Sequence, residues 1–329
     1  MDALTPCPPW LLEDGAALLA RSAAGRLPHA LLLTGVSGIG KRVFAQWLAE
    51  ALLCRSRTNF GACGDCGSCH QLLADSHADY RKLVPEGANA AIKVDPIREL
   101  VEWLQLTAGQ HSYRVALLED ADTLNRNAAN SLLKTLEEPG DHAVLILSAT
   151  RMGALPATVR SRCQKITLRM HDRAAALKWL GQTLEDPETA LAEAGGGPYN
   201  ALRDVDDEAL AARALLIQAW HDLFLHKGSV GRISDSLAGL DTLLCLATFS
   251  RWCMFAAKQK AQLPIGANPA VEAVLSDTRN RLSSEQWFTL HGRLLHLHRS
   301  NSASFKTQSV LEGIFADTRI MINGQTYRS

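Results

Sequence analysis

A glycine-rich stretch at residues 35–42, with the sequence GVSGIGKR, constrains the fold of this chain more than any other feature. It follows a short apolar run at residues 30–33, expected to be a buried strand, and precedes a segment of helical periodicity at residues 41–54. Strand, glycine-rich loop and helix in this order are typical of a P-loop, whose backbone N–H groups and lysine bind phosphates. The sequence therefore predicts an α/β domain built around a phosphate-binding loop.

This loop keeps only part of the chemistry of a P-loop. Gly35, Gly38 and Gly40 allow the backbone to approach a phosphate, and Lys41 stands where the motif has its lysine. Arg42 replaces the Ser or Thr that holds Mg²⁺, and a guanidinium group has no acceptor with which to bind a cation. We expect phosphate, ATP or ADP binding without efficient hydrolysis and with Mg²⁺ poorly held. A glycine turn that binds no ligand is the alternative.

Two acids, Glu119 and Asp120, follow an apolar run at residues 114–118 that is expected to be a strand beside the P-loop strand. In P-loop NTPases such a strand supplies an Asp that supports Mg²⁺, and hydrolysis also needs a residue that orients water. In those proteins the Asp comes first and is often followed by a Glu. Here the order is reversed, so the first carboxylate lies one methylene further from the backbone and the second one methylene closer, whereas Mg²⁺ requires strict geometry. Metal-assisted hydrolysis is therefore disfavoured. Two ordinary surface acids at a strand end are the alternative.

Strands alternate with helices as far as about residue 169, which predicts a mainly parallel sheet covered by helices on both faces. After that point no strand is expected. At 329 residues the chain is too long for one ordinary domain, so we expect a small helical domain at residues 170–205 and a larger helical one at residues 206–329. Within the helix expected at residues 95–107, Asp95 and Pro96 are predicted to be the N-cap and the first helical residue. The other strands are expected at residues 80–84, 143–149 and 164–168, and the main other helices at residues 10–24, 125–138, 173–180, 187–194, 208–225, 237–260, 284–298 and 309–321.

Four of the eight cysteines lie in one insert of the first domain, at about residues 54–70. They are Cys54, Cys63, Cys66 and Cys69. The first residues lack the pattern of a signal peptide, so a metal site is expected rather than disulfides. Four thiolates in a glycine-rich loop match tetrahedral zinc with no open position, which predicts a structural site. Free thiols and an iron–sulfur cluster are the alternatives, and His70 is a spare ligand nearby.

The overall charge limits the function of this chain. A formal net charge of zero argues against a protein that binds DNA by itself through a large basic surface. Residues 251–306 carry eight Lys or Arg against three Asp or Glu, a pattern that ordinary solvated helix faces also explain. No window has the roughly 18 uninterrupted apolar residues of a membrane span, so no membrane partner is expected.

Two further segments carry charge near the end of the first domain. Residues 132–139 read LLKTLEEP, and Glu137 and Glu138 stand at the C-terminal end of an expected helix, where negative charge opposes the helix macrodipole. These acids face either another surface or only solvent. Residues 161–163 read SRC, and Arg162 is either an arginine finger for a phosphate on a neighbouring chain or an ordinary surface residue.

LLKTLEEP, SRC, the four-cysteine insert and the altered P-loop together resemble the AAA+ clamp-loader family of bacterial DNA polymerase III, and within it the delta-prime type of subunit. The motifs span residues 35–202. The resemblance implies an AAA+ domain at residues 1–169, a helical lid at residues 170–205 and a collar at residues 206–329 that joins five subunits in a ring. It also implies that the insert binds zinc.

The same resemblance has consequences for nucleotide chemistry. Residues 148–150 (SAT) match the first sensor of the family, whereas residues 196–202, where a second sensor Arg is expected, contain Tyr199 and no Arg. A subunit of this type has little or no ATPase activity alone and offers Arg162 in trans to the ATP of an adjacent motor subunit. An autonomous AAA+ ATPase such as tau/gamma, using Lys41, Glu119 and Asp120, is the alternative.

The resemblance further implies partners and a location. The partners are the tau/gamma and delta subunits in a hetero-pentamer and, through that complex, the sliding clamp and primer–template DNA. The implied location is the bacterial cytoplasm, at the nucleoid-associated replisome.

Overall fold

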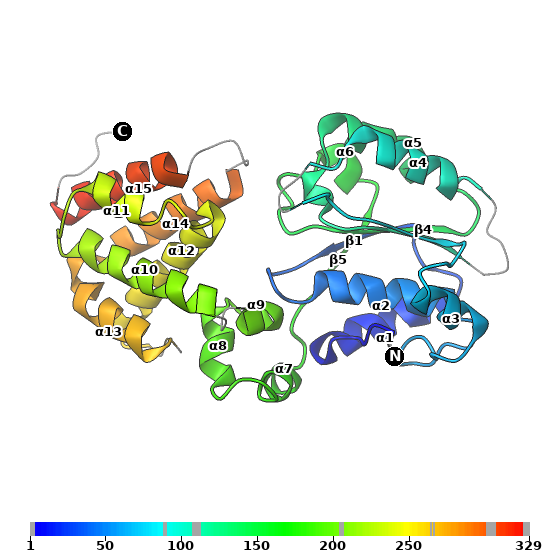
Figure 1. Ribbon diagram of the computed structural model, residues 1–329, viewed down its shortest axis with the longest axis horizontal. Helices are drawn as coiled ribbons and strands as arrows, with labels where there is room; N and C mark the ends of the chain where they lie inside the picture. The colour runs from blue at the N-terminus through cyan, green and yellow to red at the C-terminus, as the bar shows by residue number, and fades with distance from the viewer. Residues whose placement is uncertain are drawn as a thin grey trace. The chain divides into compact units, whose positions relative to one another are not determined.

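The computed structural model describes residues 4–87, 91–106, 113–203, 207–263, 265, 267–300 and 307–324. The chain forms two compact units: Met1–Gln182 with Gly197–Tyr199, and Thr183–Gly196 with Asn200–Ser329 (Figure 1). The predicted helix end at residue 107, the predicted boundary at residue 205 and residues 264, 266 and 301–306 of the basic window lie outside the described residues.

The first unit contains a parallel five-stranded sheet with the strand order β2-β3-β4-β1-β5. Its strands are β1 (Ala30–Thr34), β2 (Tyr80–Leu83), β3 (Arg114–Leu118), β4 (Ala143–Ser148) and β5 (Gln164–Thr167). All neighbouring strands run parallel. The carboxyl ends of the strands therefore meet at one edge of the sheet, where open α/β sheets bind their ligands. The predicted parallel α/β fold is confirmed.

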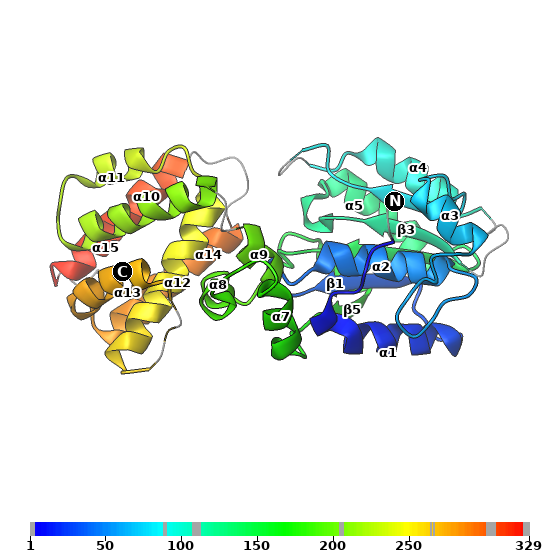
Figure 2. The ribbon, with the colours of Figure 1, turned by 60° about the horizontal axis from the view of Figure 1, so that its bottom comes forward.

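Helices cover both faces of this sheet. They are η1 (Pro9–Leu11), α1 (Leu12–Ala23), α2 (Lys41–Leu53), α3 (Gly67–Leu73), α4 (Val94–Leu104), η2 (Ala121–Thr123), α5 (Arg126–Glu137), α6 (Ala157–Arg160), α7 (Arg173–Leu180) and the start of α9 (Pro198–Arg203). Alternate residues of a strand point to opposite faces. Leu31 and Leu33 pack with residues of α1 and α2, and Ala30 and Leu32 pack with residues of α4 and α5. Figures 1 and 2 show these two helical layers on either side of the sheet.

Helix α4 begins earlier than predicted and has a different N-cap. The N-cap of α4 is Lys93, not Asp95, and no side chain caps it. Pro96 then lies within the first turn, where its missing N–H costs nothing because the first four N–H groups of a helix have no partner within the helix. Asp95 lies in the same turn, where the positive end of the helix macrodipole stabilises its negative charge.

The second unit is entirely helical in the part that the structure describes. Its helices are α8 (Pro187–Glu193), the rest of α9, α10 (Asp207–Phe224), α11 (Val230–Ser236), α12 (Thr242–Lys260), α13 (Pro269–Thr278), η3 (Arg279–Arg281), α14 (Ser284–Ser300) and α15 (Thr307–Ile322). The rings of Trp220 and Trp287 stack at its centre, with centroids 5.7 Å apart. The indole N–H of Trp220 donates to Oγ1 of Thr278 at 2.9 Å, so this buried donor is satisfied.

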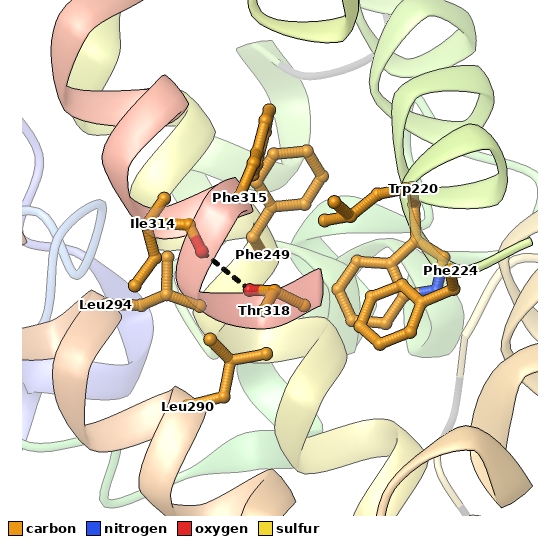
Figure 3. Close-up of a pocket in the computed structure, with 9 residues that line it drawn as sticks. Trp220, Phe224, Phe249, Leu290, Leu294, Ile314, Phe315 and Thr318 are labelled. Atoms are coloured by element: carbon orange, nitrogen blue, oxygen red, sulfur yellow. Dashed lines mark hydrogen bonds between the residues drawn. The ribbon is translucent and has the colours of Figure 1, made fainter. Parts of the chain in front are cut away.

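A small apolar cavity remains beside the ring of Trp220 (Figure 3). Its volume is about 10 Å³. The residues around it are Trp220, Leu223, Phe224, Phe249, Leu290, Leu294, Ile314, Phe315 and Thr318. The hydroxyl of Thr318 already donates to the carbonyl oxygen of Ile314 at 2.7 Å. Ligand pockets measure several hundred Å³ and carry convergent polar groups, so this space belongs to the packed core.

The predicted division into three domains remains a prediction. Within the expected lid, residues 170–182 and 197–199 belong to the first unit and residues 183–196 to the second. None of the helices among the described residues is both long enough and apolar enough to span a membrane.

Candidate functional site

The glycine-rich loop connects β1 to α2, as predicted. Gly38 and Gly40 adopt φ angles of 74° and 102°, which glycine alone reaches without strain. Lys41 is the first residue of α2 and its side chain is buried. The ammonium group of Lys41 donates to the carbonyl oxygens of Gly35 and Val36 at 3.2 and 3.0 Å, within the loop itself. Burial lowers the pKa of Lys41 to about 8, although the charges of nearby acids oppose this shift.

Arg42 reaches from the first turn of α2 to the end of β3. Its Nη2 pairs with Oδ2 of Asp120, and its Nε lies 3.5 Å from Oε2 of Glu119. The other oxygen of Glu119 accepts a charged hydrogen bond from Nζ of Lys82 at 2.8 Å. A positive guanidinium group thus lies against the acids that would support Mg²⁺ in a P-loop NTPase.

A third acid, Asp122, was not predicted from the sequence. It is buried, and its carboxylate accepts the backbone N–H groups of Thr150 at 3.1 Å and Arg151 at 3.2 Å, and Nε of Arg151 at 3.1 Å. The N–H of Asp120 donates to Oγ of Ser148 at 3.3 Å. Residues 148–150, which match the first sensor, are therefore bonded to the acids that follow β3. The spacing of two residues between Asp120 and Asp122 was the available signal.

Residues 197–199 cover the glycine-rich loop. The N–H of Tyr199 donates to the carbonyl oxygen of Gly38 at 3.0 Å. A Cβ atom on Gly197 would lie 2.1 Å from the carbonyl oxygen of Ser37, and one on Gly40 would lie 2.8 Å from the ring of Tyr199. The segment expected to hold a second sensor thus touches the loop, but it brings an uncharged tyrosine ring rather than an Arg.

An aromatic cluster holds Tyr199 in place. Its ring centroid lies 5.7 Å from that of Trp10 and 5.1 Å from that of Trp179. The indole N–H of Trp10 donates to the carbonyl oxygen of Ile39 at 2.8 Å, which ties the cluster to the loop. Burial raises the pKa of Tyr199 to about 12, so the ring stays neutral at physiological pH.

The four predicted cysteines converge in the insert after α2. Their Sγ atoms all lie within 4.8 Å of one another. The separations are 3.5 Å for Cys54–Cys63, 3.9 Å for Cys54–Cys66, 3.9 Å for Cys63–Cys69 and 3.4 Å for Cys66–Cys69. Tetrahedral zinc with Zn–S bonds of about 2.3 Å requires sulfur separations of roughly 3.8 Å, so the cluster could bind zinc. The spare ligand considered, His70, is exposed and lies outside this cluster in the described part of the chain.

Backbone hydrogen bonds favour the thiolate form of one cysteine in this cluster. Burial opposes ionisation of the Cys66 thiol, but backbone N–H groups of Cys69 and Arg55 lower its pKa to about 6. Burial raises the pKa of Cys69, and only a cation at the centre would ionise all four thiols together. The insert is anchored to α2, because Nε1 of Trp47 donates to the carbonyl oxygen of Phe60 at 2.9 Å.

Arg162 follows α6 and leads into β5. Its Nε and Nη2 lie 2.8 and 2.5 Å from Oε1 of Glu137, the last residue of α5. Its Nη1 donates to the carbonyl oxygen of Thr158 at 3.0 Å. The structure thus joins the SRC and LLKTLEEP segments, which sequence reasoning treated separately. Among the described contacts, Arg162 shares no partner with Lys41 or Arg42.

Comparison with known proteins gives the family. A family model described as "DNA polymerase III, delta subunit" matches residues 15–172. DNA polymerase III subunit delta' of Pseudomonas aeruginosa is 37% identical over 231 residues, which are 69% of this chain and 70% of that protein. The delta' subunit of Escherichia coli is 35% identical over 215 residues, 64% of each chain. The tau subunit of Escherichia coli is 31% identical over 196 residues, 57% of this chain and 30% of tau.

These matches agree with the resemblance drawn from LLKTLEEP, SRC, the cysteines and the altered P-loop, and the sheet and helices agree with an AAA+ module followed by helical domains. The chain belongs to the family of DNA polymerase III delta' subunits.

Proposed function

We propose that this chain is the delta' subunit of a clamp-loader complex and supports ATP-dependent loading of the sliding clamp onto primed DNA, without hydrolysing ATP itself. Family membership supports the role. The observation that carries the second part is the guanidinium group of Arg42 against Glu119 and Asp120. Phosphoryl transfer in P-loop NTPases depends on Mg²⁺ held between the phosphates and such acids.

Arg42 opposes the metal in two ways. It supplies no oxygen ligand, and its own positive charge repels a divalent cation at the same acids. Lys82 adds a second positive charge at Glu119. An ATP molecule at this loop would thus lack a firmly held Mg²⁺, so turnover by the isolated chain is expected to be negligible.

Arg162 is suited to act on the nucleotide of another subunit. Its side chain is partly exposed, and its partners lie on α5 and α6 rather than at the glycine-rich loop. An arginine finger offered in trans contributes roughly 10³ to 10⁵ in rate in other NTPases. We propose that Arg162 stabilises the charge on the phosphate transferred in an adjacent tau/gamma subunit.

The proposed assembly is a hetero-pentamer with the tau/gamma and delta subunits. In it, residues 1–169 form the AAA+ domain, residues 170–205 the lid and residues 206–329 the collar that joins the subunits. The sliding clamp and primer–template DNA are reached through the complex, at the replisome in the bacterial cytoplasm. Relatives named tau and delta' support this membership.

We further propose that Cys54, Cys63, Cys66 and Cys69 hold a structural zinc ion. The sulfur separations support it, and four protein ligands leave no position for a reacting water. The ion would fix the fold of the insert against α2 rather than take part in catalysis.

The test of the proposed function is Arg162→Ala in the reconstituted clamp loader. Turnover at the adjacent site is expected to fall by roughly 10³-fold or more. The DNA-stimulated ATPase rate of the complex should therefore fall by the part that the adjacent site contributes. Clamp loading should slow, while the complex still assembles. Lys165→Ala removes an exposed positive charge nearby and is the matched control. Unchanged ATPase in a normally assembled Arg162→Ala complex would refute the proposal.

An autonomous ATPase is the second candidate, because Lys41 and the three glycines of the loop are intact. ATP turnover by the purified chain alone separates the two functions. Steady turnover that Lys41→Ala abolishes would support the autonomous ATPase, whereas we expect turnover at the level of the Lys41→Ala variant.

A further inference from the structure

The contact between Glu137 and Arg162 has a specific geometry. A guanidinium group has five N–H donors. One oxygen of Glu137 receives Nε and Nη2, at 2.8 and 2.5 Å, and the carbonyl oxygen of Thr158 receives Nη1, at 3.0 Å. Among the described residues this leaves one N–H on each terminal nitrogen of Arg162. Two such donors are what a phosphate needs for bidentate recognition.

These contacts also fix the side chain before any phosphate arrives. An arginine side chain loses considerable rotamer freedom when it is ordered, and that loss opposes every contact the ordered side chain makes. Glu137 accepts from Nε and Nη2 and the carbonyl oxygen of Thr158 accepts from Nη1, so contacts at all three nitrogens fix the plane of the guanidinium group. The contacts with Glu137 and Thr158 therefore offset the loss of rotamer entropy of Arg162 within the subunit, before a phosphate binds.

Stability alone does not account for Glu137. It ends α5, where a negative charge opposes the macrodipole. The pair is partly exposed, with 35% of the Arg162 and 51% of the Glu137 side chain accessible, and ion pairs at such sites contribute little to folding. The neighbouring Glu138 is also exposed and makes no ion pair among the described residues, so the contact is particular to Glu137.

We infer that Glu137 is a positioning residue that holds Arg162 in the orientation in which its two remaining N–H groups meet the transferring phosphate of an adjacent subunit. This inference rests on the trans role proposed above for Arg162. This role accounts for an acid of the LLKTLEEP segment that the stability of α5 does not explain. Glu137 of that segment orients Arg162 of the SRC segment.

The experiment uses the complete reconstituted complex with Glu137→Ala, Glu137→Gln and the control Glu138→Gln. Glu137→Ala is expected to lower kcat at the adjacent site by about 10- to 100-fold, because misplacement by about 1 Å has effects of that size. The KM for ATP and the assembly of the complex should not change. Glu137→Gln keeps an oxygen acceptor and should recover part of the rate, and Glu138→Gln should match the wild type.

The variants Arg162→Ala and Glu137→Ala/Arg162→Ala complete the design. If Glu137 acts through Arg162, the double variant is no slower than Arg162→Ala alone. A further fall in the double variant, or a Glu137→Ala complex as fast as or faster than the wild type, would overturn the positioning role while the trans role of Arg162 stands. If Arg162→Ala itself has no effect, the proposed function fails and this inference with it.

Discussion

The guanidinium group of Arg42 lies against Glu119 and Asp120, and at the scale of single residues this contact is the basis for the proposed lack of ATP hydrolysis. The three glycines and Lys41 are the residues with which a P-loop binds a phosphate, and the ammonium group of Lys41 here donates to carbonyl oxygens of the loop itself. The arginine places a fixed positive charge beside the acids that would support the metal. The motif thus keeps the residues with which a P-loop binds a phosphate and lacks the hydroxyl that binds the metal.

Arg42→Thr should restore metal dependence to this loop. The substitution returns the hydroxyl of the P-loop motif and removes the competing charge, so affinity for ADP with Mg²⁺ is expected to rise by about tenfold or more, or about 1.4 kcal/mol. Calorimetric titration with ADP in the presence of Mg²⁺ or of EDTA measures the effect. Arg42→Lys keeps the positive charge and is the control. Equal ADP affinity for Arg42→Thr and wild type at every Mg²⁺ concentration would contradict this explanation.

Residue types allowed part of this site to be predicted. The loss of the Mg²⁺ hydroxyl is visible in the motif itself, because the motif is local in sequence. The partners of the key residues are not visible: Arg42 and Asp120 lie 78 positions apart, and Glu137 and Arg162 lie 25 apart. Periodicity carries no information on which distant charges the fold brings together, so Lys82, Asp122 and the Glu137–Arg162 pair had to come from the structure.

At the scale of elements, the cysteine insert is a small structure attached to α2. The hydroxyl of Ser68 donates to the carbonyl oxygen of Leu53 at 2.7 Å, and Nε1 of Trp47 donates to that of Phe60 at 2.9 Å. A Cβ atom on Gly61 would lie 2.3 Å from Nε1 of Trp47, so glycine is required at this approach. Nη1 of Arg57 also donates to Oγ of Ser22 at 2.9 Å, and Oγ of Ser68 is hydrogen-bonded to Nε2 of His77 at 2.9 Å, so a metal at the four sulfurs would add a central cross-link to these anchors.

Removal of the metal should therefore loosen the insert and spare the sheet. The freshly purified, reduced chain is expected to contain about one zinc per chain, because one tetrahedral site needs all four thiolates. Chelation or Cys66→Ser should remove it and make residues 54–70 sensitive to protease. Cys7→Ser, which changes a cysteine outside the cluster, should leave the zinc content unchanged. Metal analysis that returns no zinc would contradict the site, and iron in its place would favour the iron–sulfur alternative.

The elements themselves were largely predictable. Buried strands of a parallel sheet read as continuous apolar runs, and β1, β3 and β4 are buried along their whole length. The strand order was not predictable in detail, because hydrophobic patterns give the faces of a strand and not its neighbours. The start of α4 was misplaced because a proline is tolerated throughout the first turn, which leaves its position in that turn undefined.

At the scale of the whole molecule, the proposed function is that of a subunit that acts on the nucleotide of a neighbouring subunit. Residues 197–199 lie against its own glycine-rich loop, and Arg42 pairs with Asp120 beside that loop. Arg162 is partly exposed and pairs with Glu137. A net charge of zero agrees with a protein that reaches DNA through partners rather than through a basic surface of its own.

The most direct test of this account compares Lys41→Ala with Arg162→Ala, each in the reconstituted complex, by DNA-stimulated ATPase. If this chain acts on the nucleotide of its neighbour, Lys41→Ala leaves the rate at the wild-type level and Arg162→Ala lowers it by the share of one site. A rate that falls with Lys41→Ala and is unchanged with Arg162→Ala would show that the chain hydrolyses its own nucleotide, and would contradict the account.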